Sequence, residues 1–190
     1  MINAIIYFAQ NTAYCGKIKL FKLLYLLDFQ HFQETGKSVT GFDYQAWKFG
    51  PVPVKLMEEW ESFGEDLLNA VHIESEKVYD FERQSVKVNA GISFDESEFT
   101  PRQLRIMKSL SEAYKDTFSP AMIDVTHAQN GAWDKVWQNG KGAFDPIPYD
   151  LAVPEDGSRP QYHSGDSCRT NDAVVGPKSS TGIDPCYPAR

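Results

Sequence analysis

Between residues 17 and 34 the chain carries apolar side chains at the spacing of an α-helix, on almost every side. A helix that is apolar on most sides lies inside a domain, with other elements packed around it. Lys19, Lys22 and Asp28 interrupt the segment, which is too short for the about 20 apolar residues that cross a bilayer. We therefore expect a buried central helix that ends near Gly36, because glycine accepts a left-handed turn. Its main face consists of Leu20, Leu23, Leu24, Leu27 and His31, with Phe21, Tyr25 and Phe32 on the flanks.

Two helices are expected on either side of this segment. The apolar positions of residues 2–13 share one face, as in an amphipathic helix. Pro51 and Pro53 fix the backbone angle φ at a point where a helix can begin without losing a needed amide donor. We expect that third helix to include Trp60 and to end near residues 63–64.

Residues 100–103 carry a clear signal for the start of another helix. Thr100 can cap it, Pro101 suits its first position, and Gln103 completes a capping box. An apolar stripe then continues to about residue 115. A shorter helix is expected over 119–127, and the spacing of four between Trp133 and Trp137 gives a further apolar edge.

Two segments have the period of a strand. Residues 42–46 alternate between apolar and polar side chains, which predicts a short extended segment. Residues 71–88 change to a period of two, and we expect two strands around a turn near Glu82 and Arg83. An isolated hairpin is only marginally stable, so it must pack on the helices. The sequence thus predicts an α+β fold: a predominantly helical single domain with a small antiparallel β-hairpin.

The composition changes after Pro148. Residues 151–190 contain five Pro, four Gly and five Ser, few large apolar side chains and no periodicity. Such a segment buries too little apolar surface to offset the entropy lost on ordering. We therefore expect a domain over residues 1–148 and a disordered tail over residues 149–190.

The net charge is −7, and most of the acidic excess lies within the expected domain. An acidic surface repels phosphate and attracts basic proteins, although acidic runs also serve simply as solvated faces. The expected pair of helices after Thr100 raises the alternative of a DNA-binding helix-turn-helix. Residues 120–129 contain no Lys or Arg to contact phosphate, so we expect two core helices and no nucleic-acid partner.

Neither catalysis nor a metal site is indicated. The chain lacks the glycine-rich phosphate loops, the nucleophile elbow and the H-E-x-x-H zinc motif, and its three cysteines show no metal-ligand spacing. An enzyme would require Cys15, His31 and His127 to converge in space. We expect no enzyme, no cofactor and no metal. The first residues lack the features of a signal peptide, so we expect a cytoplasmic protein with reduced thiols and no membrane partner.

Five blocks of the sequence, in this order, resemble the Panacea domain of the SocA-like antitoxin family, which includes phage-associated proteins. The resemblance covers roughly residues 1–145, and the Trp-Lys-Phe-Gly-Pro-Val stretch is its most specific part. The blocks are Lys19–Tyr25, Ala46–Pro53, Thr100–Leu110, Thr126-His127 and Trp133–Trp137.

This resemblance implies an antitoxin of a toxin–antitoxin module, which neutralises a toxin encoded nearby by direct protein–protein binding. One relative acts instead as a proteolytic adaptor that delivers its toxin to a Clp-type protease, and this is the alternative. Many members carry an additional DNA-binding region. This sequence shows none, so operator binding is not expected.

The block at residues 46–53 has two interpretations. Its aromatic residues can fill the core while the glycine and proline make a turn, or part of the block can contact the toxin together with an acidic helix expected over residues 58–66. Aromatic side chains are strong interface anchors, and an acidic rim accelerates association with a basic partner. Both interpretations hold if Trp47 lies inside and Lys48 and Val54 outside. The candidate toxin-binding residues are Trp47, Lys48, Phe49, Pro51, Val54, Glu58, Glu59 and Glu61.

Overall fold

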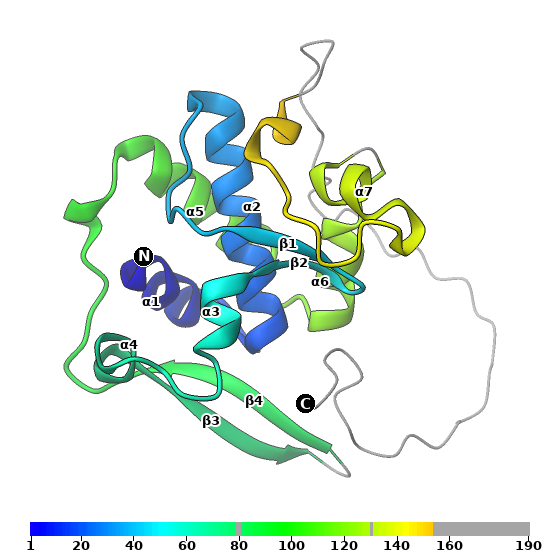
Figure 1. The fold of residues 1–190 in the computed structure, drawn as a ribbon. Coiled ribbons are helices and arrows are strands. Elements are labelled where there is room, and N and C mark those ends of the chain that lie inside the picture. Colours follow the sequence, from blue (N-terminus) through cyan, green and yellow to red (C-terminus); the bar gives the residue numbers. More distant parts are fainter. Residues whose placement is uncertain (79–80, 130, 154–190) are drawn as a thin grey trace, which may run out of the picture.

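The computed structural model describes residues 1–78, 81–129 and 131–153, and helix α2 (Lys17–Thr35) runs through its centre (Figure 1). Every residue from Ile18 to Phe29 is buried, the two lysines and the aspartate included. Gly36 ends the helix with φ 71°. The predicted buried helix and its stop are therefore confirmed.

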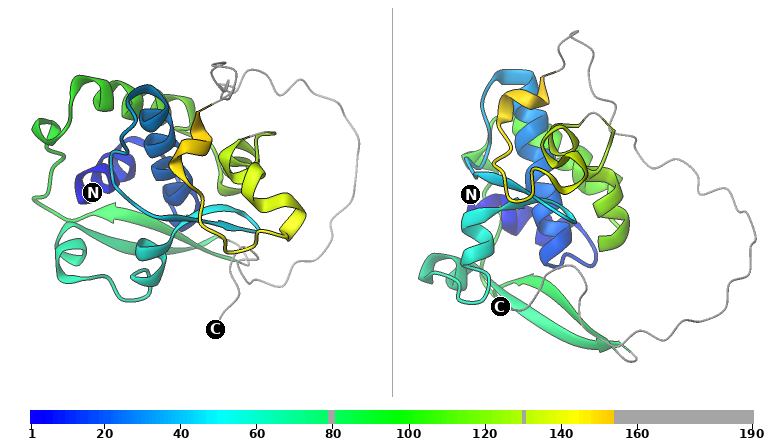
Figure 2. Two further views of the ribbon diagram at one scale, coloured as in Figure 1. Left: turned by 45° about the horizontal axis from the view of Figure 1, so that its top comes forward. Right: turned by 45° about the vertical axis from the view of Figure 1, so that its right-hand side comes forward.

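Three helices pack against α2, namely α1 (Ile2–Asn11), α5 (Pro101–Ala113) and α6 (Ser119–Thr126). The capping box of α5 is formed as predicted, since the Thr100 hydroxyl accepts from the Gln103 amide and the Gln103 side chain accepts from the Thr100 amide. Figure 2 shows these helices gathered around α2 from two further directions.

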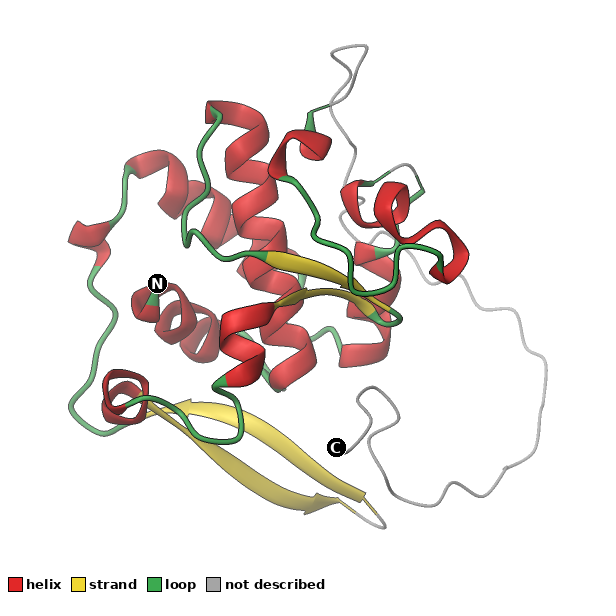
Figure 3. Cartoon of the chain, viewed as in Figure 1, coloured by secondary structure: helices red, strands yellow, loops and turns green. Residues whose placement is uncertain are grey.

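Two antiparallel hairpins complete the fold (Figure 3). The shorter one joins β1 (Tyr44–Trp47) to β2 (Gly50–Pro53) and packs on α2. The longer one joins β3 (Val71–Val78) to β4 (Phe81–Val88) and lies along one edge of the molecule. The α+β, mostly helical fold class is confirmed, with two hairpins in place of the one that the sequence predicted.

The predicted turn near Glu82 and Arg83 is wrong. Both residues lie inside β4, where they face Lys77 and Glu76 of β3. The Arg83 guanidinium lies 2.5 Å from the Glu76 carboxylate, so these charged residues join the two strands as a cross-strand pair. Charged residues suit an exposed strand as well as a turn, so the period of two did not fix the position of the turn.

The predicted third helix is also wrong in its limits. Pro51 and Pro53 lie in β2, which among the described strands pairs with β1 alone, so the missing amide donors cost no ladder hydrogen bond on its other side. Helix α3 (Val54–Glu58) is short, and α4 (Glu65–Ala70) follows after a turn. The acidic stretch 58–66 is thus not one helix. The reason is that the chain turns so that Trp60 and Phe63 pack into the core.

The C-terminal part of the described chain lies beside β1. After α7 (Ala132–Trp137), the Phe144 and Ile147 amides donate to the carbonyls of Ala46 and Tyr44, each at 2.8 Å. Residues 149–152, which the sequence placed in the tail, form a short 3₁₀ helix, η3 (Tyr149–Ala152), packed on α2. Two other 3₁₀ turns are η1 (Glu96–Glu98) and η2 (Gln138–Gly140). The remainder of the expected tail, residues 154–190, lies outside the described residues.

Candidate partner-binding site

Three of the sequence blocks meet at Gly50, the first residue of β2. The buried Lys22 ammonium of α2 donates to the Pro51 carbonyl at 2.9 Å. A Cβ atom at Gly50 would lie 2.8 Å from both Lys22 Nζ and Thr126 Oγ1, and the backbone there has φ 102°. Only glycine fits between α2 and α6 at this point, because any side chain would be both strained and overpacked. This contact fixes the β1–β2 turn on the helical body.

Two further sequence blocks, Thr126-His127 at the end of α6 and Trp133–Trp137 in α7, pack against the β1–β2 turn. The rings of His127 and Trp133 are parallel, with centroids 3.8 Å apart, and Trp137 stacks on Trp133 at 5.5 Å. The Trp133 indole N–H donates to the Trp47 carbonyl at 3.0 Å. Burial and the nearby Lys22 charge lower the pKa of His127 to about 4, so this imidazole is neutral near pH 7. Its Nε2 atom has no hydrogen-bond partner among the described residues.

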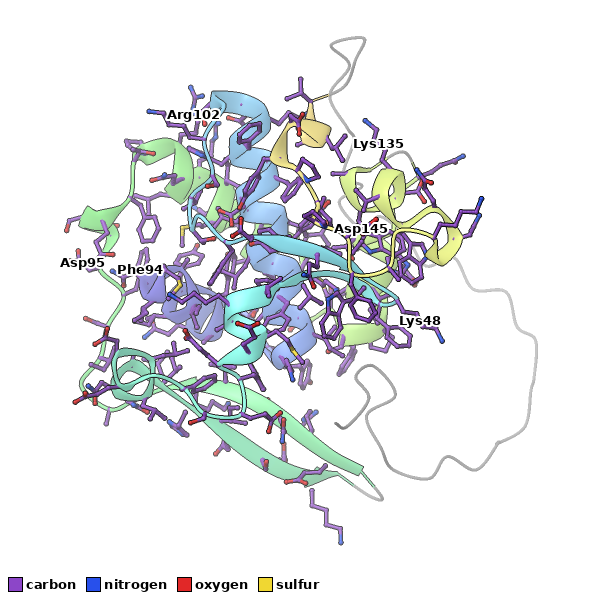
Figure 4. All side chains as sticks on the ribbon, viewed as in Figure 1. Lys48, Phe94, Asp95, Arg102, Lys135 and Asp145 are labelled. Atoms are coloured by element: carbon purple, nitrogen blue, oxygen red, sulfur yellow. The ribbon has the colours of Figure 1, made fainter. Side chains whose placement is uncertain are left out.

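An exposed aromatic surface lies at this turn, and we call Trp47, Lys48, Phe49 and Phe144 the aromatic corner. Phe144 is 61% exposed and meets the half-buried Trp47 edge-to-face at 5.2 Å. Phe49 is half-buried, and Lys48 is exposed and points away from the body (Figure 4). Four aromatic and cationic side chains thus share one corner of the surface.

The backbone of Phe144 is strained. Its φ of 68° lies in the left-handed region, which costs a residue with a side chain roughly 1 kcal/mol or more. Gln138 and Asn139, just before it in the chain, also have positive φ. Strain of this kind concentrates at functional sites, because packing elsewhere must hold it in place. Here the Phe144 amide donates to the Ala46 carbonyl. This hydrogen bond fixes the backbone in the conformation that exposes the aromatic ring to solvent.

The structure divides the candidate toxin-binding residues into two groups. Trp47, Lys48 and Phe49 lie at the turn, whereas the others apart from Pro51 lie on or after α3. The four residues of β2 separate the groups by about 13 Å of extended chain. In the second group Glu58 and Glu61 are exposed, and Val54 and Glu59 are half-buried. Pro51 is buried and contributes its carbonyl to Lys22.

We call the exposed carboxylates of this second group and of α4 the acidic edge. Its members are Glu58, Glu61, Glu65 and Asp66, all of them exposed. Glu61 lies 3.9 Å from Lys17, the first residue of α2. The acidic edge therefore borders the N-terminal end of α2.

Phe144 is a surface residue that sequence reasoning missed. Residues 138–148 show no periodicity, and an aromatic side chain in such a segment is expected to be buried. No sequence signal distinguishes this exposed ring, because its exposure follows from the positive φ and the pairing with β1.

Asp28 joins α2 to three distant segments. Its carboxylate accepts from the Val39 and Thr40 amides at 2.8 and 2.7 Å, from the Thr40 hydroxyl, and from the Tyr44 hydroxyl at 2.8 Å. Tyr149 adds a longer contact at 3.4 Å. Burial raises the pKa of Asp28, and these donors oppose that rise because they favour the charged form. The set of donors marks a structural role.

Lys19 performs the same function at the other end of α2. It is fully buried, and its ammonium donates to the carbonyls of Ala13 and Lys115 at 2.6 and 3.0 Å. It thereby holds the α1–α2 loop against the segment after α5. Burial lowers the pKa of Lys19.

The convergence that an enzyme would have required is not formed. Cys15 precedes α2 and His31 lies fourteen residues into it, which places them about 20 Å apart along the helix axis. His31 bonds to the Lys37 carbonyl, and burial raises the pKa of the Cys15 thiol to about 11. Within the described ranges, no group of three or more His, Cys, Asp or Glu side chains is arranged to hold a metal ion. The described helices also include none with the length and apolar character needed to cross a membrane.

Fold and site together define a mostly helical α+β domain in which buried residues of α2, α6 and α7 brace an exposed aromatic corner. Residues 20–134, more than half of the chain, match the family Antitoxin SocA-like, Panacea domain, and the chain belongs to this family. The resemblance found in the sequence is thereby confirmed, and the family supports an antitoxin role with a protein partner. Neither the curated proteins nor the solved structures gave a match.

Proposed function

We propose that this protein is a non-enzymatic antitoxin that neutralises a toxin encoded nearby by binding it directly. Family membership supports the antitoxin role, and the observation that carries the binding site is Phe144, an exposed aromatic ring on a strained backbone beside Trp47. Aromatic side chains supply much of the binding free energy at protein interfaces, and a rigid support lowers the entropy lost on binding. The aromatic corner has both properties.

The acidic edge would complement the aromatic corner by attracting a basic partner electrostatically. Exposed carboxylates accelerate encounter with a basic partner, and the effect falls as salt rises. A basic toxin would therefore associate fastest at low ionic strength. The corner would hold it, and the acidic edge would raise the rate at which it arrives.

Replacement of Phe144 by glycine tests this proposal. Glycine removes the ring and relieves the left-handed backbone, so the gain of roughly 1 kcal/mol from strain offsets the lost ring contact of about the same size. We expect the thermal midpoint to change by only a few degrees. Affinity for the protein encoded beside this chain's gene should fall at least about tenfold, as at an interface hot spot. The readouts are a co-expression pull-down, titration calorimetry and growth rescue.

Phe118→Ala is the matched control, because Phe118 is another exposed aromatic residue, 54% exposed and stacked on Tyr14 at 4.5 Å. It should bind as the wild type does. Equal affinity of the Phe144→Gly variant and the wild type would place the binding site elsewhere.

The same co-expression separates direct neutralisation from the adaptor alternative. Sequestration predicts a lasting complex and a constant toxin level, whereas delivery to a Clp-type protease predicts rescue with a falling toxin level. A neighbouring protein that is toxic alone and equally toxic in the presence of this chain would contradict the antitoxin function itself.

A further inference from the structure

Strand β3 has one edge that faces away from its partner. The Val86 amide of β4 donates to the Cys15 carbonyl at 2.8 Å, so it points away from β3. Val86 lies opposite Ile73 in the register, and in an antiparallel pair both members of such a couple direct their backbone groups outward. The alternation then assigns outward amides to Ser75 and Lys77 as well.

The rest of the chain packs against one edge of this hairpin, that of β4, and leaves the other edge, that of β3, without a neighbouring strand in the described part of the chain. The edge of β4 is covered by the α1–α2 loop, where a Cβ at Gly16 would lie 2.7 Å from the Gln84 carbonyl. Along β3, the outward amides of Ile73, Ser75 and Lys77 have no backbone hydrogen bond to any part of the chain that the structure describes. In this strand Ile73 is half-buried, and residues 74–77 are exposed. Figure 3 shows β3 as the outer strand.

Folded proteins normally shorten, block or cover such an edge, because it templates pairing with another chain. We infer that the edge of β3 binds an extended, basic segment of the partner toxin by β-strand addition. This inference rests on the proposed antitoxin function and gives the toxin a second contact besides the aromatic corner. Main-chain hydrogen bonds would supply affinity, and alternate side chains would supply specificity.

The carboxylates on one face of β3 favour a basic added strand, whereas Lys77 lies on the opposite face with Ile73 and Ser75. Glu74 and Glu76 lie on one face, and their side chains are 58% and 64% exposed although Lys87 and Arg83 of β4 pair with them. A strand added beside β3 would place its side chains about 5 Å from these carboxylates. Lys or Arg at alternate positions would therefore complement them, with an apolar residue beside Ile73.

The same charges oppose a second copy of this chain as the occupant. Antiparallel pairing of two β3 strands about Ser75 would put Glu74 of one copy opposite Glu76 of the other, twice over. Like charges directly opposite one another are destabilising. The chain's own residues 154–190 are also poor candidates in sequence, because five prolines within them lack the amide that a ladder needs.

Hydrogen exchange followed by NMR on the full chain tests the inference, with the protein encoded beside its gene as the probe. Saturating probe should slow exchange of the Ile73, Ser75 and Lys77 amides by at least about tenfold, because they gain hydrogen bonds. The Val86 amide, already bonded to Cys15, should be unchanged and serves as the internal control.

Two variants at one position provide an independent measurement. Ser75→Pro removes an outward amide without removing a bond to β4, whereas Ser75→Ala keeps the amide and removes only the hydroxyl. Affinity for the probe should fall at least about tenfold in the proline variant and stay within about twofold in the alanine variant. Thermal unfolding of the two variants shows whether the hairpin is still formed. If the proline variant has lost it, the exchange experiment on the wild type decides the question.

The outcomes separate this inference from the proposed function. A stable complex with unprotected β3 amides overturns strand addition and leaves the antitoxin function intact. Protection of these amides in the free chain means that a second copy or residues 154–190 occupy the edge, and this also overturns it. The absence of any complex removes the partner and overturns both.

Discussion

His127 is a residue whose charge the fold suppresses. Its ring stacks on Trp133, and burial together with the Lys22 charge disfavours protonation, while Asp124 and Asp134 act in the opposite direction. The pKa falls from 6.5 to about 4, so between these values the unfolded chain binds more protons than the folded one. The stability that His127 contributes is therefore present above pH 6.5 and lost as the pH falls through about 4.

Replacement of His127 by phenylalanine tests this dependence, because phenylalanine keeps a ring on Trp133 and cannot be protonated. Since His127 is only half-buried, we expect about 1 kcal/mol of extra destabilisation in the wild type between pH 7 and about pH 4.5, relative to the variant. Urea unfolding at both pH values measures it. Identical pH profiles for the two proteins would show that the histidine is not perturbed.

At the scale of residues, the sequence drew attention to the polar residues of the buried helix but did not predict their structural roles. Lys19, Lys22 and Asp28 looked like interruptions of an apolar helix, and they are buried clamps. Their partners are main-chain groups far along the chain, which no helical period encodes. Whether Trp47 and Lys48 contact a toxin stays a prediction.

At the scale of elements, the β1–β2 hairpin depends on a single close approach. Gly50 allows β2 to reach α2 and α6, and the Lys22 ammonium then binds the next carbonyl. The sequence block around Trp47 was the most specific part of the family resemblance, which the family match confirms. Its conformation was not predicted, because prolines at 51 and 53 suggest the start of a helix as readily as an edge strand.

A pair of glycine variants tests this dependence. Gly50→Ala adds a methyl group within 2.8 Å of two polar atoms at φ 102°, whereas Gly41→Ala adds one at φ 73° with nothing within 4 Å. We expect Gly50→Ala to cost about 2–4 kcal/mol and Gly41→Ala about 1 kcal/mol. Chemical denaturation of both gives the comparison. Equal costs would mean that backbone strain alone matters and that the contact with Lys22 does not.

Local signals predicted the remaining elements to different degrees. The capping box at Thr100 is formed, because that signal is complete within four residues. The helix after Pro53 is shorter than predicted because the core takes up Trp60 and Phe63 from a turn. Tertiary packing decided the limits that local patterns left open.

At the scale of the whole molecule, the packed body extends beyond the segment that matches the family. The match ends at residue 134, yet Ile147 is buried, and the Tyr149 hydroxyl donates to the Phe42 carbonyl at 2.6 Å. Helix α1 similarly packs on α2 before the match begins. Residues on both sides of the match thus complete the core.

Two truncations test where the body ends. A chain ending at residue 153 should have a free energy of unfolding within about 1 kcal/mol of that of the full chain, because the composition of residues 154–190 predicts that they bury little apolar surface. A chain ending at residue 143 loses Ile147 and Tyr149 and should be destabilised by about 3–6 kcal/mol, a large share of a typical domain's stability. Circular dichroism and urea unfolding distinguish the two. Equal stability of both truncations would show that residues 144–153 are dispensable.

The buried lysines of α2 have a consequence for how this protein can evolve. Lys19 and Lys22 bind carbonyl oxygens of residues 13, 51 and 115, and every amino acid carries that oxygen. Mutations at those three positions therefore leave the acceptors in place, whatever side chain is substituted. The side chains at these three positions can therefore change while the hydrogen bonds that hold α2 to its neighbours remain.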